Sequence, residues 1–525
     1  MKGLERLSVI SELSRTAATA GGWKHKELFR ILHKDDIWIA ASENLKGTPG
    51  VTKETLDGTG MVKLQKIQKK VLDESYQFNP VKYPKQMPDD KIVQEVIRMV
   101  LAAIYEPMFD NRSFGFRSGI GVHDALQYVE KEFRWMDWVI KGDIKDAYPT
   151  IEHKTLCEIL SRTIEDQRFM NLIHKSLKGG IYVNPETLYS KIGVPQGSIV
   201  SPILANIYYH ELDTWVTQKG KEVYSEKSTK RHRLEYQIQK VSKQIDESER
   251  NSGQRANLVR EIKRLIQQRN QTPSLLDQGI EVRYVRYADD WMIGIKGPRR
   301  IAEQIKEDAT EFLRIQLKQE LDPVKTKIID LRAGKICFLG YEIFLARNMK
   351  LVKYKRQEAK QTIRRSPRRL RFQVPVEKIL KRLNERGYIA YEDNKFRPVS
   401  KRSYTPLEDE VIVNHFKSVW TGLLNFYSGT TNLSHLQYIH YLLHMSCAMT
   451  LAHRHRSSSS KIFKKHGKRL EIVEKRADIP KIKAYFPYKT SWKVSDRKWY
   501  SARTFKDPFT IYANRVNRSR FVFVK

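Results

Sequence analysis

The residues with the clearest chemical content are two adjacent carboxylates, Asp289 and Asp290, in the tetrad YADD. The tetrad lies within Val282–Ile295 (VRYVRYADDWMIGI), where β-forming residues lead in and an apolar run leads out. This pattern predicts a β-hairpin whose tip presents two acids above a buried strand pair. Adjacent ionised carboxylates repel each other unless a cation lies between them, so the tip is a candidate cation site. The alternative is an exposed acidic tip that binds nothing.

A third acid follows another apolar strand upstream. In Val139–Tyr148 (VIKGDIKDAY) the strand delivers Asp143 at its end, and the backbone carbonyl of Ile144 is a further oxygen donor. With the hairpin acids, these groups could bind two Mg²⁺ ions roughly 4 Å apart. One ion would lower the pKa of an attacking 3′-hydroxyl, and the other would neutralise a triphosphate and the leaving pyrophosphate. Spacing alone leaves open the alternative of three unrelated surface acids.

The overall charge favours a polyphosphate partner. The 525 residues include 96 Lys and Arg against 60 Asp and Glu, a formal net charge of +36, with 40% apolar residues. A folded protein with so large a positive field is typical of nucleic-acid binding, while a ribosomal partner or an anionic membrane surface stays open. Cys157, Cys337 and Cys447 form no CxxC pair, which disfavours disulfides and cysteine-bound zinc and is consistent with a reducing compartment.

We expect no membrane association, because no apolar stretch reaches the roughly 18 residues that a membrane helix needs. The nearest candidate, Ile439–Ala452, is interrupted by His440 and His444 and predicts a buried helix. Lys219–Asn270 differs from its flanks in its high charge and in its regularly spaced apolar residues, which begin at Leu234 and end at Leu265. That spacing predicts two amphipathic helices hinged at residues 251–253, which we interpret as a solvated insertion.

Further motifs surround the acidic strands in a fixed order, which rejects the alternative of unrelated acids. They are FGFRSG at 114–119, GVPQGSIVSPILANIYYHELD at 193–213, VKTKI at 324–328 and FLGY at 338–341. With YADD, these motifs resemble the reverse transcriptase/maturase proteins encoded by group II introns. The resemblance extends from the N-terminus to about residue 470, and the YVRYADD wording and the helical insertion resemble the mitochondrial-like subgroup.

The resemblance implies an α+β fold: a right-hand polymerase, with fingers and a palm built on an antiparallel sheet, followed by an α-helical thumb/maturase domain. The implied regions are an N-terminal extension and fingers at 1–135, a palm at 136–345 with a helical insertion at about 217–275, a basic linker and start of the thumb at 346–410, the maturase/thumb domain at 411–470, and a basic aromatic tail at 471–525. The tail is a candidate for a reduced DNA-binding segment.

The resemblance also assigns roles in the palm. Asp143, Asp289 and Asp290 match the catalytic, metal-binding acids, and Tyr148 matches the aromatic residue that lies under the incoming sugar and excludes a 2′-hydroxyl. Gln196 and Gly197 match the loop beside the nascent base pair. Arg117 matches a position near the template; the alternative is a structural arginine paired with a buried acid. Asn206 and Asp213 are expected to orient the helix that follows the loop.

In the maturase region, Phe416–Leu470 carries the matching text LLNFYSGTTNL and HMSCAMTLAHRHRSSSSKIFKKHGKRL. Its basic edge suits the phosphates of intron RNA or of a primer–template helix. The preceding run KQTIRRSPRRLR at 360–371 reads as a hinge that also contacts phosphates, with a flexible linker as the alternative. The candidate RNA-binding residues are Arg364, Arg365, Arg368, Arg454, Arg456, Lys461, Lys464 and Lys465.

Two departures from the family pattern leave two functions open. The fingers stretch YQFNPVKYPKQMPDDKIVQ is shorter than usual and lacks an arginine expected to grip the triphosphate, although Lys82, Lys85 and Lys91 remain. No cysteine follows Leu470, so the nuclease domain of many relatives is not expected. We favour a reverse transcriptase that also promotes splicing; the alternative is a splicing-only maturase on an inactive polymerase scaffold. A viral-type RNA-copying polymerase is disfavoured by the maturase-like region.

The implied partners are group II intron RNA, an RNA template with a DNA primer, and dNTPs, and a homodimer stays open. The expected compartment is a mitochondrion or other organelle, with the bacterial cytoplasm as the alternative.

Overall fold

The chain forms two compact units, one ending at Asp330 and the other comprising Leu331–Ser501. The computed structural model describes residues 2–20, 23–45, 60–80, 87–179, 181–183, 186–188, 192–195, 197–224, 230–247, 253–271, 280–346, 351–356, 359–365, 369–474, 481–489 and 497–500. Within these residues, no helix combines the length and the apolar character needed to span a membrane.

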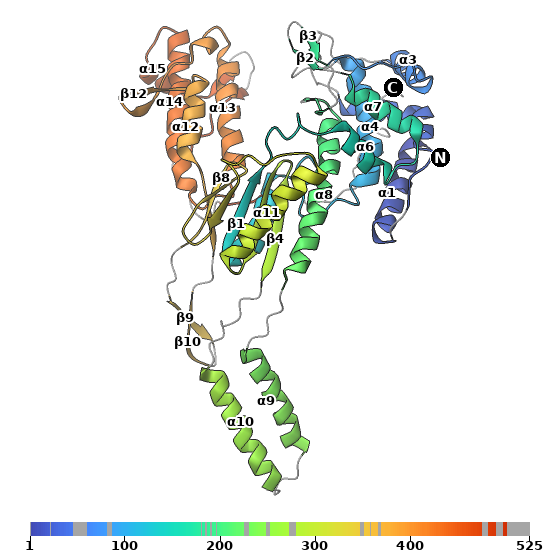
Figure 1. Ribbon diagram of the computed structural model, residues 1–525. Coiled ribbons are helices and arrows are strands. Elements are labelled where there is room, and N and C mark those ends of the chain that lie inside the picture. The colour runs from blue at the N-terminus through green and yellow to red at the C-terminus, as the bar shows by residue number, and fades with distance from the viewer. Residues whose placement is uncertain are drawn as a thin grey trace. The chain divides into compact units, whose positions relative to one another are not determined.

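The N-terminal part of the first unit is a helical assembly around α4 (Pro88–Tyr105), whose residues, including several polar ones on one face, are buried almost throughout. Pro88 and two acids occupy the first turn of α4, where the missing N–H and the negative charges suit a helix start. Helices α1 and α2 pack against it (Figure 1). The other elements here are α1 (Gly3–Ala20), η1 (Phe29–His33), α2 (Asp35–Asn44), α3 (Met61–Leu72), α6 (His153–Ser161), α7 (Gln167–Leu177), β2 (Ile181–Val183) and β3 (Glu186–Leu188).

A four-stranded antiparallel sheet of order β4-β5-β1-β6 follows this helical assembly. Its strands are β1 (Trp138–Asp143), β4 (Glu281–Tyr287), β5 (Asp290–Lys296) and β6 (Lys327–Asp330). Helices α5 (Val122–Glu132) and α8 (Ser201–Glu222) pack on β4, and α11 (Arg299–Gln316) packs on β1. The interior of β5 is buried without alternation, as expected of a central strand covered on both faces. The helical η2 (Phe133–Trp135) immediately precedes β1.

Gly142 in β1 is a packing requirement of this sheet. The indole of Trp291 on β5 lies over it so closely that a Cβ at residue 142 would come within 2.0 Å of the ring. Trp291 is fully buried in the core. The glycine therefore lets the large side chain cover β1 at the end of the strand that carries Asp143.

The charged insertion folds as the two predicted amphipathic helices, α9 (Lys230–Glu247) and α10 (Gly253–Gln271), which contact each other. Val241 and Leu265 are buried, while most charged side chains of both helices are exposed. The guanidinium of Arg255 donates to the carbonyl of Ile245 across the hinge, 2.9 Å away. The two-helix prediction is thus confirmed.

The second unit contains a small sheet of order β11-β8-β7 and a group of helices. The FLGY motif lies in this sheet, so it belongs to the second unit. The boundary between the two units falls after Asp330, whereas the family resemblance implied a palm that ends near residue 345. Its strands are β7 (Ile336–Phe338), β8 (Tyr341–Leu345), β9 (Leu351–Arg356), β10 (Ala359–Arg365), β11 (Leu370–Gln373), β12 (Ile389–Glu392), β13 (Lys395–Pro398), β14 (Ile472–Glu474) and β15 (Lys481–Ala484). Its helices are α12 (Val376–Glu385), η3 (Arg402–Tyr404), α13 (Asp409–Phe426), η4 (Leu433–His435), α14 (Leu436–Arg454) and α15 (Ser459–His466).

Helix α14 is the central helix of the second unit, and the prediction of a buried helix at Ile439–Ala452 is confirmed. Its two interior histidines bind backbone carbonyls: His440 Nε2 lies 2.8 Å from the oxygen of Pro487, and His444 Nε2 lies 2.8 Å from that of Lys468. Burial lowers the pKa of His444 to about 4, so this ring is neutral at physiological pH.

The described part of the tail packs into this unit. The ring of Trp499 stands beside Gly429, where a Cβ would lie 2.1 Å from it, and Arg497 Nε donates to the Gly429 carbonyl at 2.7 Å. Trp499 also packs edge-on against Phe372 and lies near Tyr341 of the FLGY motif. Arg497 and Trp499 therefore pack against the aromatic residues of this unit, whereas Lys498 and Tyr500 are exposed.

Candidate active site

The two acidic motifs meet at one end of the sheet in the first unit. Asp143, the last residue of β1, is the direct cross-strand partner of Asp290, the first residue of β5. Asp289 lies in the two-residue turn that joins β4 to β5, between Ala288 and Asp290. Antiparallel partners have Cα atoms about 4.5–5.5 Å apart, so pairing alone brings Asp143 and Asp290 together from distant parts of the chain.

A glycine of the FGFRSG motif supports the turn from below. A Cβ on Gly115 would lie 2.3 Å from the Ala288 nitrogen, so only glycine allows this backbone approach. The Phe114 N–H donates to the carbonyl of Arg286 at 2.9 Å, and Asn206 Nδ2 donates to the Gly115 carbonyl at 2.8 Å. Ala288 has φ +57, a left-handed conformation that is costly for a non-glycine residue and must be held by its surroundings.

A buried ion pair provides that hold. Arg286 and Asp213 are both fully buried and join by two hydrogen bonds, Nε to Oδ1 and Nη2 to Oδ2, each 2.7 Å long. Nη1 of Arg286 donates to the Ala288 carbonyl and to Asn206 Oδ1, both at 3.0 Å. The arginine thereby ties the strained turn to helix α8.

The environment of the pair sets its charge state. Burial by itself raises the pKa of Asp213, but the guanidinium of Arg286 more than reverses this and leaves that pKa well below its ordinary value. The hydroxyl of Tyr284 donates a further bond to Asp213 Oδ1 at 2.8 Å. The expected role of Asn206 and Asp213 in orienting α8 agrees with these contacts. The sequence analysis did not identify Arg286. The residue could have been recognised as an arginine immediately before the tetrad, in a strand whose other residues are typical of a buried core.

Burial and neighbouring carboxylates destabilise the charged forms of Asp289 and Asp290. Burial first, opposed by Lys141 and reinforced by Asp289 and Asp143, raises the pKa of Asp290 to about 6. Burial and then the charge of Asp143 also raise the pKa of Asp289. Oδ1 of Asp290 is buried and has no hydrogen-bond partner among the described residues; Lys141 Nζ lies 3.6 Å away.

Lys325, in the VKTKI motif, is the cation nearest to Asp143. Its Nζ donates to Asp143 Oδ2 at 2.7 Å and lies 3.5 Å from Asp322 Oδ2. The sequence placed this motif in the right order but assigned its lysine no role. The ion pair balances one of the three negative charges at the sheet end.

The donor set fits a hard divalent cation. Oδ1 of Asp290 accepts no hydrogen bond among the described residues, and burial, reinforced by the neighbouring carboxylates, raises the pKa values of Asp289 and Asp290; a divalent cation bound to these oxygens would offset both costs. Ile144 forms an isolated bridge with Leu321, and its side chain is buried, so its main-chain carbonyl is the group that could reach an ion. The geometry is not a closed cage: within the described ranges, no three His, Cys, Asp or Glu side chains are grouped tightly enough to hold a metal.

Tyr148 and the loop that precedes α8 lie beside the acids. The Val194 N–H donates to the Tyr148 carbonyl at 2.9 Å, and Gly193, with φ +96, approaches Pro149 so closely that a Cβ would lie 2.8 Å from its oxygen. Burial, and then the carboxylate of Asp289, raise the pKa of the Tyr148 phenol. Gly197 is exposed with φ +86, whereas Gln196 lies outside the described residues.

Arg117 requires a correction, because it does not present its charge to a template. Its side chain is 2% exposed, and Nε binds Glu106 Oε2 at 3.0 Å. The other guanidinium nitrogens donate to the carbonyls of Glu106, Asp110 and Ser113. These contacts support the alternative of a structural arginine. Likewise, Lys91 is buried in α4, and burial lowers its pKa; Lys82 and Lys85 lie outside the described residues.

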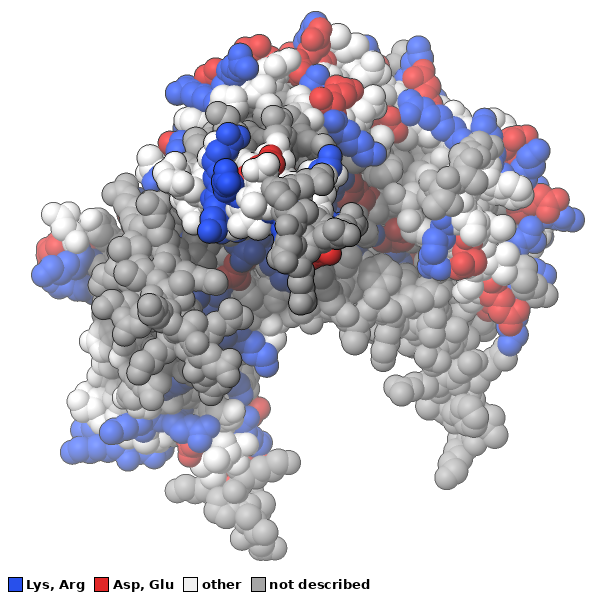
Figure 2. Space-filling view, turned by 90° about the horizontal axis from the view of Figure 1, so that it is seen from below, with Lys and Arg blue, Asp and Glu red and all other residues white. Residues whose placement is uncertain are grey.

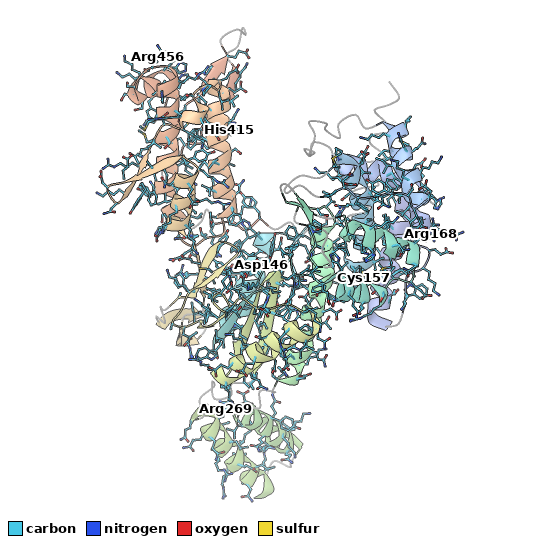
Figure 3. All side chains as sticks on the ribbon, turned by 45° about the horizontal axis from the view of Figure 1, so that its top comes forward. Asp146, Cys157, Arg168, Arg269, His415 and Arg456 are labelled. Atoms are coloured by element: carbon cyan, nitrogen blue, oxygen red, sulfur yellow. The ribbon has the colours of Figure 1, made fainter. Side chains whose placement is uncertain are left out.

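The candidate RNA-binding residues of the second unit divide into paired and unpaired cations. Arg454 binds Asp409, with Nε 3.0 Å from Oδ1, and the Thr405 carbonyl. Arg456 lies in the turn after α14 (Figure 3). Arg456 and three lysines of the next helix are exposed, and they form no ion pair within the described ranges. The lysines are Lys461, Lys464 and Lys465 of α15. Arg364 and Arg365 lie in β10, opposite Val352 and Leu351, with side chains outside the described set, as is all of Arg368.

Positive and negative side chains are mixed on the face that Figure 2 shows. In Figure 2, Lys and Arg side chains are spread over the described surface with Asp and Glu between them, so positive charge is not gathered in one patch on that face. We define the α15 edge as Arg456, Lys461, Lys464 and Lys465; it is cationic without interleaved acids.

An antiparallel sheet with three carboxylates at one end, joined to a helical fingers region, is the palm of a right-hand polymerase. The family model for reverse transcriptase (RNA-dependent DNA polymerase) matches residues 67–229, and that for type II intron maturase matches residues 367–515. The chain is 31% identical over 481 residues to the group II intron-encoded protein LtrA of Lactococcus lactis subsp. cremoris, covering 87% of this chain and 79% of LtrA. It therefore belongs to the family of group II intron-encoded reverse transcriptase/maturase proteins, and the resemblance seen in the sequence is confirmed.

Two fungal relatives extend the comparison. An uncharacterized 91 kDa protein in the cob intron of Schizosaccharomyces pombe is 31% identical over 548 residues, 97% of this chain and 65% of that protein. A putative COX1/OXI3 intron 1 protein of Saccharomyces cerevisiae is 31% identical over 494 residues, 89% of this chain and 57% of that protein. The chain thus spans about two thirds or less of the length of these two relatives. Membership of the reverse transcriptase family implies dependence on a divalent metal.

Replacing Arg286 by Met should destabilise the first unit by about 3–5 kcal/mol, because it leaves Asp213 buried without a counter-charge. Denaturant unfolding monitored by tryptophan fluorescence measures the loss. The matched control is Arg299→Met, which removes the exposed i,i+4 pair with Glu303 and should cost about 0.5 kcal/mol or less. Adding Asp213→Leu to Arg286→Met should recover part of the loss; equal losses in the two arginine variants would contradict the role given to the pair.

Asp290 should make the metal-free protein sensitive to pH. Its folded-state pKa, near 6, exceeds the ordinary 3.8, so the stability linked to its protonated form is complete below about pH 4 and is lost as the pH rises through about 6. The difference corresponds to at most about 3 kcal/mol. In EDTA, wild type should therefore lose stability relative to Asp290→Asn between about pH 4 and about pH 7. Parallel pH profiles of the two proteins in thermal unfolding would refute this.

Proposed function

We propose that the protein binds group II intron RNA, promotes its splicing, and copies RNA into DNA at the site formed by Asp143, Asp289 and Asp290. The observation that carries the polymerase part is the register that makes Asp143 and Asp290 cross-strand partners with Asp289 in the adjoining turn. A scaffold that only bound RNA would not need to hold three carboxylates together at the cost of raised pKa values and a buried unsatisfied oxygen.

In the proposed reaction, Asp143, Asp289, Asp290 and the Ile144 carbonyl would hold two Mg²⁺ ions, which would supply the charge that activates a primer 3′-hydroxyl and neutralises the triphosphate. The chain's own residues set the geometry. The Arg286–Asp213 pair keeps the turn in place, and Lys325 holds the Asp143 carboxylate through a hydrogen bond. In this proposal Tyr148, whose phenol pKa the carboxylate of Asp289 helps to raise, contacts the sugar of an incoming dNTP, and Gly197, with φ +86, lets backbone approach the nascent base pair.

The RNA-binding part rests on the α15 edge. Its four exposed cations are free of acidic partners within the described ranges, so phosphates can bind them without displacing an existing pair. Asp409 holds Arg454 and His455 in place behind this edge, with His455 Nε2 2.8 Å from Asp409 Oδ2. The relatives come from a bacterium and from fungi, which is consistent with either an organellar or a bacterial host.

The second candidate function is splicing without polymerisation. The observation that favours it is the burial of Lys91. A buried Lys91 cannot bind the triphosphate of a dNTP, although it is one of the three lysines that remain in the shortened fingers stretch. A polymerase that captures dNTPs weakly would keep its RNA-binding surfaces and lose only copying.

One experiment separates the two candidates: primer extension on an RNA template beside a splicing assay, for wild type and Asp289→Asn/Asp290→Asn. We expect the double variant to lose extension by more than about 100-fold, because two metal ligands lose their charge, and to splice as wild type does. Wild type that splices but extends no primer would establish the second candidate. Failure of both proteins to bind structured RNA above a salt-matched control would refute both.

Changing Lys461, Lys464 and Lys465 together to Ala should weaken intron RNA binding and reduce the slope of log affinity against log salt by roughly 2–3, about 0.7–0.9 for each phosphate that the variant no longer neutralises. Filter binding at several salt concentrations measures both quantities. The matched control changes three exposed lysines that already have acidic partners: Lys63, Lys154 and Lys381. It removes the same net charge, so an equal loss of slope in the two variants would contradict a specific α15 edge.

A further inference from the structure

Gln94, on the fingers helix α4, is a buried amide whose bonds reach two other elements. It is 2% exposed. Its Oε1 accepts from Ser198 Oγ at 2.7 Å and from the Ile199 N–H at 3.1 Å, both in the loop before α8. Its Nε2 donates to Ser176 Oγ of α7 at 3.4 Å. One side chain thus connects α4, α7 and the loop before α8, which lie in one region of the first unit (Figure 1).

Hydrogen bonds hold the loop before α8 at both of its ends. Gln94 accepts those at the C-terminal end, Ser198–Ile199. On the side of the acids, the Gly193 and Val194 N–H groups donate to the carbonyls of Ile151 and Tyr148 at 2.7 and 2.9 Å. Within the loop, the Pro195 carbonyl accepts from the Ser198 N–H at 3.2 Å and from Ser201 Oγ at 2.8 Å. These bonds close a turn that leaves Gly197 exposed with φ +86. The outgoing side of this turn, Ser198–Ile199, is bound by Gln94.

An apolar side chain in place of Gln94 could not keep this arrangement, because it offers no acceptor to the loop. Ser198 is buried, so its hydroxyl cannot exchange Gln94 for bulk water when the amide is removed. A buried donor without a partner drives the surrounding backbone to move until it finds one. The part of the loop free to move is the part next to the exposed Gly197, since the incoming side stays bound to Tyr148 and Ile151.

We propose that Gln94 is a positioning residue of the polymerase site: it fixes Ser198 and Ile199, next to the exposed Gly197, and thereby sets the KM for the incoming dNTP. The inference rests on the proposed polymerase function and deepens it, because it places control of nucleotide capture on a fingers helix that carries no reacting group. The competing account is that Gln94 only fastens α4 to its neighbours in the core.

Ser176 offers the control that distinguishes these accounts. Ser176→Ala removes the bond from Gln94 to α7 and leaves both loop bonds in place, whereas Gln94→Met keeps the side-chain length and removes these three bonds together. Steady-state primer extension with varied dNTP gives KM and kcat, while RNA affinity and the melting temperature report on the rest of the protein. For Gln94→Met we expect KM to rise about tenfold with kcat within about threefold and RNA affinity unchanged. For Ser176→Ala we expect an unchanged KM.

Ser198→Ala tests the same link from the loop and does not depend on the folding of the Gln94 variant. It should raise KM about threefold, and the double variant Gln94→Met/Ser198→Ala should be no worse than Gln94→Met by more than about twofold, since the Gln94–Ser198 bond that Ser198→Ala removes is already lost in Gln94→Met. Equal effects of Ser176→Ala and Gln94→Met on KM, or a change in melting temperature alone, would overturn the inference while leaving the polymerase function standing. Wild type that extends no primer would overturn both.

Discussion

The active end of the palm depends on one buried ion pair. Arg286 and Asp213 lie in the core with no exposed surface, and their two short hydrogen bonds fix β4 against α8. The same guanidinium holds the carbonyl of Ala288, whose φ of +57 an unconstrained chain would avoid. A buried pair of this kind contributes little net stability over an apolar substitute, but it specifies geometry, because any other arrangement leaves a charge unpaired in the core. Here the specified geometry is the turn that carries Asp289.

The unfavourable electrostatic energy of the site is concentrated at the carboxyl groups that are proposed to bind the metal. Burial and mutual repulsion raise the pKa values of Asp289 and Asp290, so ionised carboxylates are held ready for a cation that relieves both. Near these acids, two glycines let backbone segments come closer than a side chain would allow. Gly115 lies against the backbone of the turn, and Gly193 lies against the backbone of Pro149. The charges of the α15 edge, in contrast, are solvated and not buried. Its cations are exposed and unpaired within the described ranges, which suits phosphates that bind and leave.

Much of the fold and the site could be read from particular residues. The VRYVRYADDWMIGI pattern predicted the β4–β5 hairpin, the spacing from Leu234 to Leu265 predicted α9 and α10, and the interrupted apolar run at Ile439–Ala452 predicted a buried helix. Local periodicity suffices in these cases because each element's pattern lies within its own residues. Motif order then led to the family. Arg117 shows the limit: its motif suggested a template contact, but whether an arginine faces solvent or Glu106 depends on segments that its own neighbours do not reveal.

The sequence by itself determined which acids are candidates for catalysis, several of the strands and helices, and the family to which the chain belongs. Only the tertiary structure decided that Asp143 faces Asp290, that Arg286 binds Asp213, and that Gln94 reaches Ser198. The physical reason is that register and buried polar pairing are long-range properties. A strand's own pattern fixes which face is buried, but its partner residue, and the donor that satisfies each buried acceptor, come from parts of the chain far away in sequence.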